Sequence, residues 1–274
     1  MGRVAVLGSL NVDVVTRVAR LPGPGETVLG ESAGRFAGGK GGNQAMAARR
    51  AGADVVMIGR VGADDAGAAY LDRLNRHGVR TEVPQCADAP TGTAYITLDE
   101  HGENVIIVVP GANERVEEQS VTAAALGPGD VLLCTLEVPA AVVAGAARQA
   151  AEAGARVIIN LAPYTWLPHD VIDLADPLVV NESEMRELAD SDLIPGSLLV
   201  TFGAAGARWD GEEVSGIRLD DADVVDTVGA GDAFCGALAA ALAAGGTRRE
   251  ALEAANRAGA EAVQWTGAQP DAAL

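Results

Sequence analysis

The chain has 274 residues, 49% of them hydrophobic and 21% charged, which suits a globular protein with a sizeable core. Its formal net charge of −18 argues against a nucleic-acid backbone or an anionic membrane surface as a partner. Apolar runs are too short to span a bilayer, and Cys86, Cys134 and Cys235 lie far apart in apolar surroundings, so we expect reduced core thiols in a cytoplasmic protein.

Short apolar runs alternate with alanine-rich segments along the chain. The runs cover residues 3–9, 54–62, 130–138, 156–163, 177–182 and 197–203. The segments with helical spacing cover residues 43–53, 66–78, 139–155 and 233–245. Apolar strands separated by helices predict an α/β fold with a mostly parallel central sheet flanked by helices. In such sheets, ligands bind at the carboxyl ends of the strands.

Two segments, at residues 11–36 and 90–109, do not follow this alternation of apolar runs and helical segments. Both contain the period-two alternation of strands, and the sequence D-E-H-G-E-N at 99–104 is typical of a hairpin turn. Neither is long enough for a domain, so we expect a small β-sheet lid on a single domain spanning residues 1–274. The edges and apolar face of a small lid need cover, which predicts a homodimer through the lid sheets.

The stretch G-R-F-A-G-G-K-G-G-N at 34–43 resembles a phosphate-binding P-loop. Gly34, Gly39 and Lys40 fit the pattern G-x-x-x-x-G-K, but Gly41 stands where a Ser or Thr would hold magnesium. A P-loop also follows the first strand directly, whereas a lid segment intervenes here. We therefore interpret these residues as a substrate-binding loop.

A second glycine-rich turn, G-A-G-D at 229–232, opens an alanine-rich helix at about Gly231. A helix N-terminus presents unpaired N–H groups and the positive end of its dipole, so this turn is suited to an anion. Asp232 places a carboxylate beside it, as phosphoryl transfer to an alcohol requires. The turn alone leaves open a second interpretation, in which Asp232 only stabilises the helix start.

The motifs D-T-V-G-A-G-D at 226–232 and G-G-K-G-G-N-Q-A at 38–45 resemble the two signatures of the ribokinase-like (PfkB) carbohydrate kinases. Further motifs occur in the family's order: G-S-L-N-V-D (8–13), P-G-A-N (110–113), L-E (136–137), N-L-A-P (160–163), N-E-S-E (181–184), T-F-G-A-A-G (201–206) and G-A-Q-P (267–270). Within the family, the chain looks most like the ribokinase branch. The resemblance implies a ribokinase-like three-layer fold and transfer of the γ-phosphate of ATP to the 5-hydroxyl of D-ribose.

The resemblance also implies roles for individual residues. Asp232 matches the catalytic base, and the backbone N–H groups of Gly229, Ala230, Gly231 and Asp232 match the anion hole. The residues implied to bind ribose are Asn11, Asp13, Gly39, Lys40, Asn43, Glu137 and Asp232. The residues implied to bind ATP are Asn181, Thr201, Gly203, Gly206, Gly231 and Asn256.

Two cations are implied in the same way. Glu184 would organise Mg²⁺ through water, which suits an ion that commonly keeps several waters. Taken alone, Glu184 would be a carboxylate on a helix face. The residues implied to bind K⁺ are Asp226 and, through their carbonyls, Val228, Ala262, Trp265 and Gly267, with Asp271 near the closing position.

The chain departs from the family pattern in two places. Residues 185–197 form a much shorter segment than usual, so we expect a peripheral helix on the ATP side to be missing. After G-A-Q-P, relatives continue into a final helix, which is also expected to be missing. Two alternatives remain: a PfkB-type kinase for another furanose, a nucleoside or a sugar acid, or a non-catalytic protein that binds a sugar or nucleotide. Gly42 is expected to leave extra room in the sugar pocket.

Overall fold

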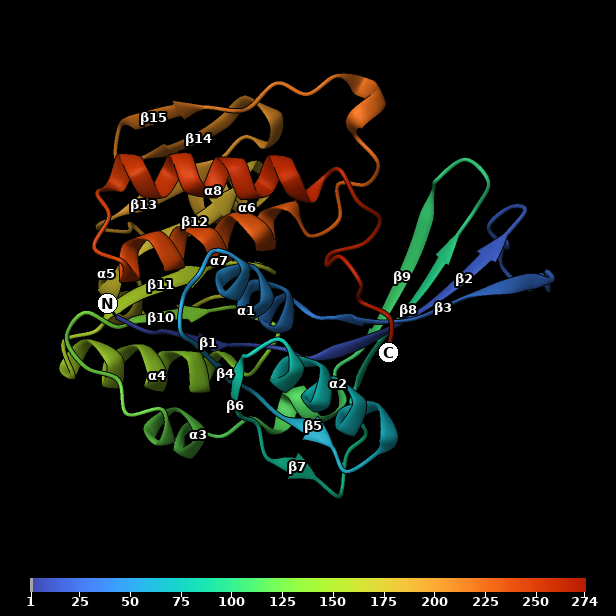
Figure 1. Cartoon of the computed structure of the whole chain (residues 1–274), viewed down its shortest axis with the longest axis horizontal. Helices are drawn as coiled ribbons and strands as arrows, with labels where there is room; N and C mark the ends of the chain where they lie inside the picture. Colours follow the sequence, from blue (N-terminus) through green and yellow to red (C-terminus); the bar gives the residue numbers. More distant parts are fainter. Residues whose placement is uncertain (1) are drawn as a thin grey trace.

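A nine-stranded sheet forms the centre of the computed structural model, which describes residues 2–274 apart from the side chains of residues 119, 120, 123 and 221 (Figure 1). Its strands, in spatial order, are β15 (Glu212–Ser215), β14 (Gly206–Trp209), β13 (Leu198–Thr201), β12 (Ala175–Asn181), β11 (Arg156–Asn160), β10 (Val131–Cys134), β1 (Val4–Leu7), β4 (Val55–Ile58) and β6 (Arg80–Glu82). Pairing is parallel from β6 to β13 and antiparallel in the β13–β14 and β14–β15 pairs. The predicted mostly parallel sheet is confirmed.

Helices cover both faces of this sheet, because alternate residues of each strand point to opposite sides. Val4 and Val6 of β1 belong to one apolar cluster, and Ala5 and Leu7 belong to the other. The helices of the first cluster are α1 (Lys40–Arg50), α2 (Asp65–Arg76), α7 (Ala230–Ala243) and α8 (Arg248–Ala262). The helices of the second are α3 (Glu118–Ala123), α4 (Ala140–Glu152), α5 (His169–Leu174) and α6 (Glu182–Ala189). The three-layer fold is therefore as predicted.

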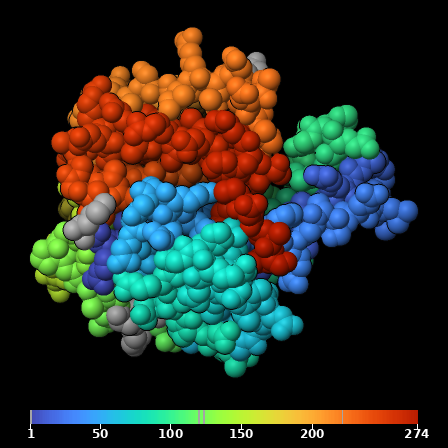
Figure 2. Space-filling model, viewed as in Figure 1, coloured from blue at the N-terminus to red at the C-terminus, as the bar shows by residue number. Residues whose placement is uncertain are grey.

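A second sheet projects from one end of the body (Figures 1 and 2). It contains, in spatial order, β3 (Gly30–Gly38), β2 (Asn11–Val18), β8 (Gly92–Leu98) and β9 (Asn104–Val109). The β2–β8 pair is parallel and the two outer pairs are antiparallel. These strands come from the two segments predicted to form the lid. The C-terminal residues lie at its base, where Ala37 N donates to Ala272 O at 2.7 Å and Leu274 N donates to Arg35 O at 3.0 Å.

Some boundaries differ from the sequence-based expectations. The apolar run 54–62 is divided between β4 and β5 (Val61–Gly62), and β5 pairs with β7 (Gln85–Cys86) in a small third sheet. Gly59 and Arg60 separate the two strands, and a Cβ on Gly59 would lie 2.9 Å from Gly8 O, so this close approach of backbones requires a glycine. The run 130–138 leaves the sheet after Cys134, and the following residues carry Glu137 toward the end of the strands.

Other elements were not predicted: the β14–β15 hairpin, the helices α3, α5, α6 and α8, and the 3₁₀ helices η1 (Gly111–Arg115), η2 (Gly203–Ala205) and η3 (Asp221–Asp223). In the fully described stretch between α6 and β13, residues 190–197 contain only bends, turns and irregular backbone, in agreement with the expected missing helix. All three cysteines are buried and free, as predicted. Among residues 2–274, no helix combines the length and apolarity needed to cross a bilayer.

Candidate active site

Glu137 links the end of β10 to the glycine-rich loop that opens α1. Its Oε2 accepts a hydrogen bond from the backbone N of Lys40 at 3.0 Å and another from the Ser9 hydroxyl. The unpaired N–H groups and the dipole at the N-terminus of α1 stabilise a carboxylate at this position. Glu137 and the glycine-rich loop, far apart in sequence, therefore lie side by side.

Small residues let this loop approach the strands. Gly39, the N-cap of α1, has a φ of +82°, a backbone conformation that favours glycine. A Cβ on Gly41 would lie 2.5 Å from the carbonyl carbon of Gly8, and a Cβ on Gly38 would overlap the Asp13 carboxylate. The loop therefore lies directly against the ends of β1 and β2.

The expectation for Gly42 is wrong. A Cβ at this position would overlap the hydroxyl of Tyr70, which donates to Gly38 O at 2.7 Å. Tyr70 lies on α2 and is fully buried. Gly42 therefore accommodates the Tyr70 side chain inside the protein, and it leaves no extra room for a sugar.

Asn11 and Asp13 come from the first strand of the lid. The Asn11 Oδ1 accepts from Asn113 Nδ2 at 2.7 Å, and the Asn113 Oδ1 accepts from Leu10 N at 2.9 Å. Burial, and then the negative charge of Glu137, raise the pKa of Asp13 to about 7. Two carboxylates and an amide thus lie near one another beside the loop, a set that suits the hydroxyl groups of a sugar. Asn113 had no predicted role, although it belongs to the P-G-A-N motif.

Asp232 is buried in the first turn of α7 and is held by two amide side chains of α1. Its Oδ2 accepts from Asn43 Nδ2 at 2.9 Å, and its Oδ1 accepts from Gln44 Nε2 at 2.9 Å. The two helices come close at Gly236, where a Cβ would lie 2.5 Å from Gln44 O. Gln44 was missed from the sequence. Its place beside Asn43 in the G-G-K-G-G-N-Q-A motif was the available signal.

The turn before Asp232 has the geometry of an anion site. Gly229, the N-cap of α7, has a φ of +79°, and a Cβ there would lie 2.5 Å from Ala268 Cα. The N–H groups of Gly231 and Asp232 lie in the first turn, where an α-helix offers them no intrahelical acceptor. Ala230 N donates to Thr227 O at a long 3.3 Å. Two of the four predicted donors are therefore free of the helix, and a third is only weakly engaged.

A small cavity of about 120 Å³ opens in front of this turn. Its polar lining comprises Lys40, Asn160, Asn181, Glu184, Thr201 and Asp232, together with Gly229 and Gly231. Nearby negative charge, first that of Asp232 and then that of Glu137 and Glu184, raises the pKa of Lys40 in spite of its burial. The Lys40 side chain, which lines the small cavity, therefore stays charged, whereas its backbone N donates to Glu137. Asn160 and Cys235, which also lines this cavity, had no predicted role.

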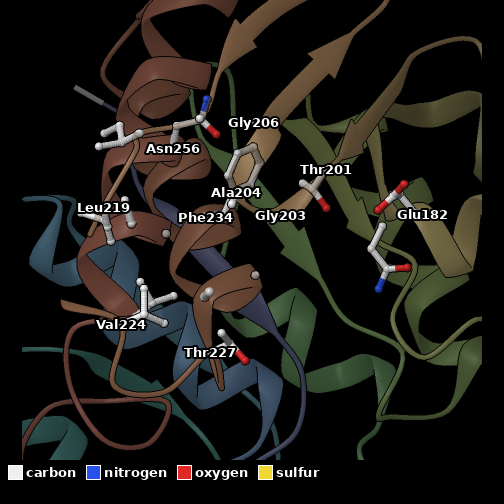
Figure 3. Close-up of a pocket in the computed structure, with 18 of the residues that line it drawn as sticks. Glu182, Thr201, Gly203, Ala204, Gly206, Leu219, Val224, Thr227, Phe234 and Asn256 are labelled. Carbon is white, nitrogen blue, oxygen red and sulfur yellow. The ribbon is translucent and has the colours of Figure 1, made fainter. Parts of the chain in front are cut away.

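A larger cavity of about 810 Å³ adjoins the small one (Figure 3). All the residues implied to bind ATP line it: Asn181, Thr201, Gly203, Gly206, Gly231 and Asn256. Figure 3 shows Leu219 and Val224 on one side of the cavity and Thr201 and Glu182 on the other. The apolar wall was not predicted and includes Ile217, Leu219, Val224, Phe234 and Val263. An apolar wall with a few polar groups is typical of a site for a base or another flat ligand.

Asn181 and Glu184 form a capping box at the start of α6. The Asn181 Oδ1 accepts from Ser183 N at 2.8 Å and Glu184 N at 2.9 Å, and Glu184 Oε2 accepts from Asn181 N at 2.8 Å. Burial raises the pKa of Glu184, which also lines the small cavity. A carboxylate anchored in this way beside a phosphate-sized cavity fits an Mg²⁺ ion held through water.

The residues implied to bind K⁺ belong to neighbouring segments. The Asp226 carboxylate accepts from Val228 N at 3.0 Å and from Gly267 N at 2.9 Å, and Val225 N donates to Val263 O at 2.8 Å. These bonds bring residues 226–228 beside residues 262–267, which fits a cation held by carbonyls and one carboxylate. Asp271 differs, because its carbonyl accepts from Arg73 at 2.6 Å and the residue is exposed. Within residues 2–274, no group of three or more His, Cys, Asp or Glu side chains could hold a metal ion.

The chain is similar in sequence to known carbohydrate kinases. A model of the pfkB family of carbohydrate kinases matches residues 1–273. The ribokinase of Bacillus subtilis is 39% identical over 280 residues, covering 98% of this chain and 95% of that protein. The ribokinase of Mus musculus is 34% identical, covering 97% of this chain and 90% of that protein.

The chain is also similar to solved structures of kinases. A structure of Arabidopsis thaliana ribokinase complexed with ribose and ATP has a TM-score of 0.84 and 31% identity, covering 98% of this chain and 95% of that one. The Burkholderia thailandensis nucleoside kinase in complex with inosine has a TM-score of 0.76 and 25% identity, covering 98% and 93%.

Proposed function

Because the chain belongs to the pfkB family of carbohydrate kinases, we propose that it transfers the γ-phosphate of ATP to the 5-hydroxyl of D-ribose. The observation that carries this proposal is the position of Asp232. Its carboxylate accepts hydrogen bonds from α1, whose first residues belong to the glycine-rich loop proposed to bind the sugar. The start of α7, which carries Asp232, opens onto the small and larger cavities. The similarity to ribokinases, one of them complexed with ribose and ATP, supports this choice of substrates.

In the proposed reaction, Asp232 accepts the proton of the 5-hydroxyl as its oxygen attacks the γ-phosphorus. The bond between that phosphorus and the bridging oxygen breaks, and ADP leaves. The N–H groups at 229–232 donate to the negative charge of the transferring phosphoryl group, and the Lys40 ammonium adds a positive charge beside it. Asp13 and Glu137 accept hydrogen bonds from sugar hydroxyls, and Asn11, Gly39 and Asn43 complete the pocket.

Two cations belong to this proposal. Mg²⁺, organised through water by Glu184, would neutralise phosphate charge. K⁺ would be held by Asp226, by the carbonyls of Val228, Ala262, Trp265 and Gly267, and near Asp271. It would stabilise the turn that carries the N–H groups. The hydrogen bonds of Asp226 to Val228 and Gly267 support the second assignment.

The test is ATP consumption by the purified protein over a panel of sugars and nucleosides, with and without K⁺. We expect ribose to be the best acceptor. The Asp232→Asn variant should lose about 10²–10⁴-fold in kcat, the usual contribution of a positioned general base. Asp173→Asn, an exposed acid on α5, is the matched control and should keep full activity. Ribose turnover unchanged in Asp232→Asn would refute the assigned base.

A nucleoside is the second candidate substrate, favoured by the similarity to a nucleoside kinase complexed with inosine. Turnover of a nucleoside in preference to ribose would support this candidate and displace ribose. The non-catalytic alternative is disfavoured by the intact surroundings of Asp232. Binding of ribose with no release of ADP would restore that alternative and refute the kinase.

We also propose that the protein is a cytoplasmic homodimer that pairs through its lid sheets. All of β9 is exposed, including an unbroken apolar run at residues 105–109, and Ile107 at its centre is 60% exposed. Apolar strands of this kind are usually covered by a partner. The three buried, free cysteines support a reducing compartment.

A further inference from the structure

A series of buried hydrogen bonds leads from α2 to the Asp232 carboxylate. Arg73 Nη2 donates to Gln269 Oε1 at 3.1 Å, and Gln269 Nε2 donates to Asn43 Oδ1 at 2.7 Å. Asn43 Nδ2 then donates to Asp232 Oδ2 at 2.9 Å. Arg73 is 3% exposed, Gln269 is 1% exposed and Asn43 is 6% exposed, so water does not compete for these bonds.

The two ends of this series determine its direction. A guanidinium group has only donors, so the Gln269 oxygen must face Arg73 and the Gln269 nitrogen must face Asn43. The Asn43 oxygen then faces Gln269, which leaves its nitrogen to face Asp232. An ionised carboxylate has only acceptors, so the series ends with a matched pair. A flip of either amide would place two acceptors or two donors against each other without water.

Further contacts hold Arg73 and Gln269 in place. Arg73 Nη1 donates to Asp271 O at 2.6 Å and Arg73 Nη2 donates to Pro270 O at 3.3 Å, while Gln269 Nε2 also lies 3.4 Å from Ala37 O. The guanidinium group thereby holds the segment 269–271 against α2. Neither Arg73 nor Gln269 lines either of the two cavities described above, so the orientation of the amides is set from outside them.

We propose that Arg73 and Gln269 are positioning residues that fix the Asn43 amide so that it donates to Asp232, and thereby aim the catalytic base. This inference rests on the proposed kinase function. It assigns both residues a role in the chemical step beyond anchoring the C-terminal segment.

Two replacements of Gln269 with similar size separate these roles. Gln269→Glu keeps an acceptor for Arg73 but presents a second oxygen to Asn43, so the Asn43 amide must turn its own oxygen toward Asp232. Gln269→Met makes neither bond and leaves Asn43 free to keep donating to Asp232. If Gln269 aims the base, kcat should fall at least about tenfold in Gln269→Glu, and kcat of Gln269→Met should be higher than that of Gln269→Glu. If Gln269 only anchors the C-terminal segment to α2, kcat should be higher in Gln269→Glu than in Gln269→Met, because only the Glu variant keeps the contact with Arg73.

The measurement is kcat at saturating ribose and ATP, together with the KM for ATP and the melting temperature of each variant. We expect the loss in Gln269→Glu to fall on kcat while the KM for ATP stays within about twofold. Arg76→Lys, an exposed position on the same helix, is the control for general effects on α2. Gln269→Glu activity equal to or above that of Gln269→Met would overturn the inference.

If Gln269→Glu does not fold at the assay temperature, Arg73→Lys and Arg73→Met test whether Arg73 sets the orientation of the Gln269 amide. Lysine also has only donors, whereas methionine has none, so kcat should be at least about tenfold higher in Arg73→Lys than in Arg73→Met. Equal values, or a higher value in Arg73→Met, would overturn the inference. An inactive wild-type protein would instead refute the proposed kinase function, so the two failures are distinguishable.

Discussion

The carboxyl group of Asp13 is expected to lower the stability of the unliganded protein at neutral pH. Burial and the charge of Glu137 raise its pKa from 3.8 to about 7. The folded protein therefore holds this proton more tightly than the unfolded chain, and folding stability falls as the pH rises from about 4 to about 7. At about 1.4 kcal/mol per pH unit, the loss reaches about 4 kcal/mol above pH 7.

The Asp13→Asn substitution tests this expectation, because asparagine is similar in shape and carries no charge. Without ribose at pH 8, the variant should be more stable than the wild type by up to about 4 kcal/mol. At about 2–4 °C per kcal/mol, that corresponds to an increase in melting temperature of up to about 8–16 °C. At pH 4 the two proteins should melt together. The assay is thermal unfolding followed by circular dichroism, with Glu31→Gln, an exposed lid residue, as the control.

Ribose should bind more tightly when Asp13 is ionised, although the unliganded protein is more stable when Asp13 is protonated. At pH 6 only about a tenth of Asp13 is ionised, so the Kd for ribose should be about tenfold weaker at pH 6 than its limiting value at high pH. Calorimetric titration of ribose at several pH values measures this directly, and Asp13→Asn should bind weakly at every pH. If Asp13→Asn gives no stabilisation at pH 8, or the same stabilisation at pH 4 and pH 8, the reasoning about burial is wrong.

Three further predictions follow from single contacts. Lys40→Met should lose about 10–100-fold in kcat/KM for ATP, because a charge-assisted hydrogen bond contributes about 1.5–3 kcal/mol. If the variant instead binds ribose more weakly and keeps its kcat, Lys40 belongs to the sugar site alone. Gly42→Ala should lower the free energy of unfolding in urea by about 1–3 kcal/mol through overlap with Tyr70, and Tyr70→Phe in the same chain should recover part of the loss. Ile107→Glu should convert the proposed dimer to a monomer in sedimentation velocity, whereas an unchanged sedimentation coefficient would exclude the β9 face as the interface.

The residues that the family resemblance implies for ATP all line the larger cavity, and several of them follow successive strands. Asn181 ends β12, Thr201 ends β13 and Gly206 begins β14, and neighbouring strands of one sheet place these positions at the same edge. The apolar wall could not be found in this way. Ile217 and Leu219 lie in irregular backbone after β15, where no strand or helix period shows which way a side chain points.

Contacts between distant segments were also beyond prediction. Gln44 and Asp232 are separated by 188 positions, and Arg73 and Gln269 by 196. Helical spacing could indicate that Arg73 lies on α2, but an arginine on a helix is most often solvated. Only the packing of the C-terminal segment against α2 shows that this arginine is buried and bonded to backbone carbonyls.

The two glycine-rich turns are alike in local structure, and their surroundings separate their roles. Each supplies a glycine N-cap with positive φ, Gly39 for α1 and Gly229 for α7, and so each presents the positive end of a helix. At α1 that end already holds the carboxylate of Glu137. At α7 the N–H groups of Gly231 and Asp232 open onto the small cavity with Lys40. A phosphate at the start of α1 would have to displace or approach a carboxylate, whereas α7 offers donors and a nearby cation. The resemblance to a P-loop at residues 34–40 is therefore a matter of sequence pattern, and the electrostatics favour the second turn as the phosphate site.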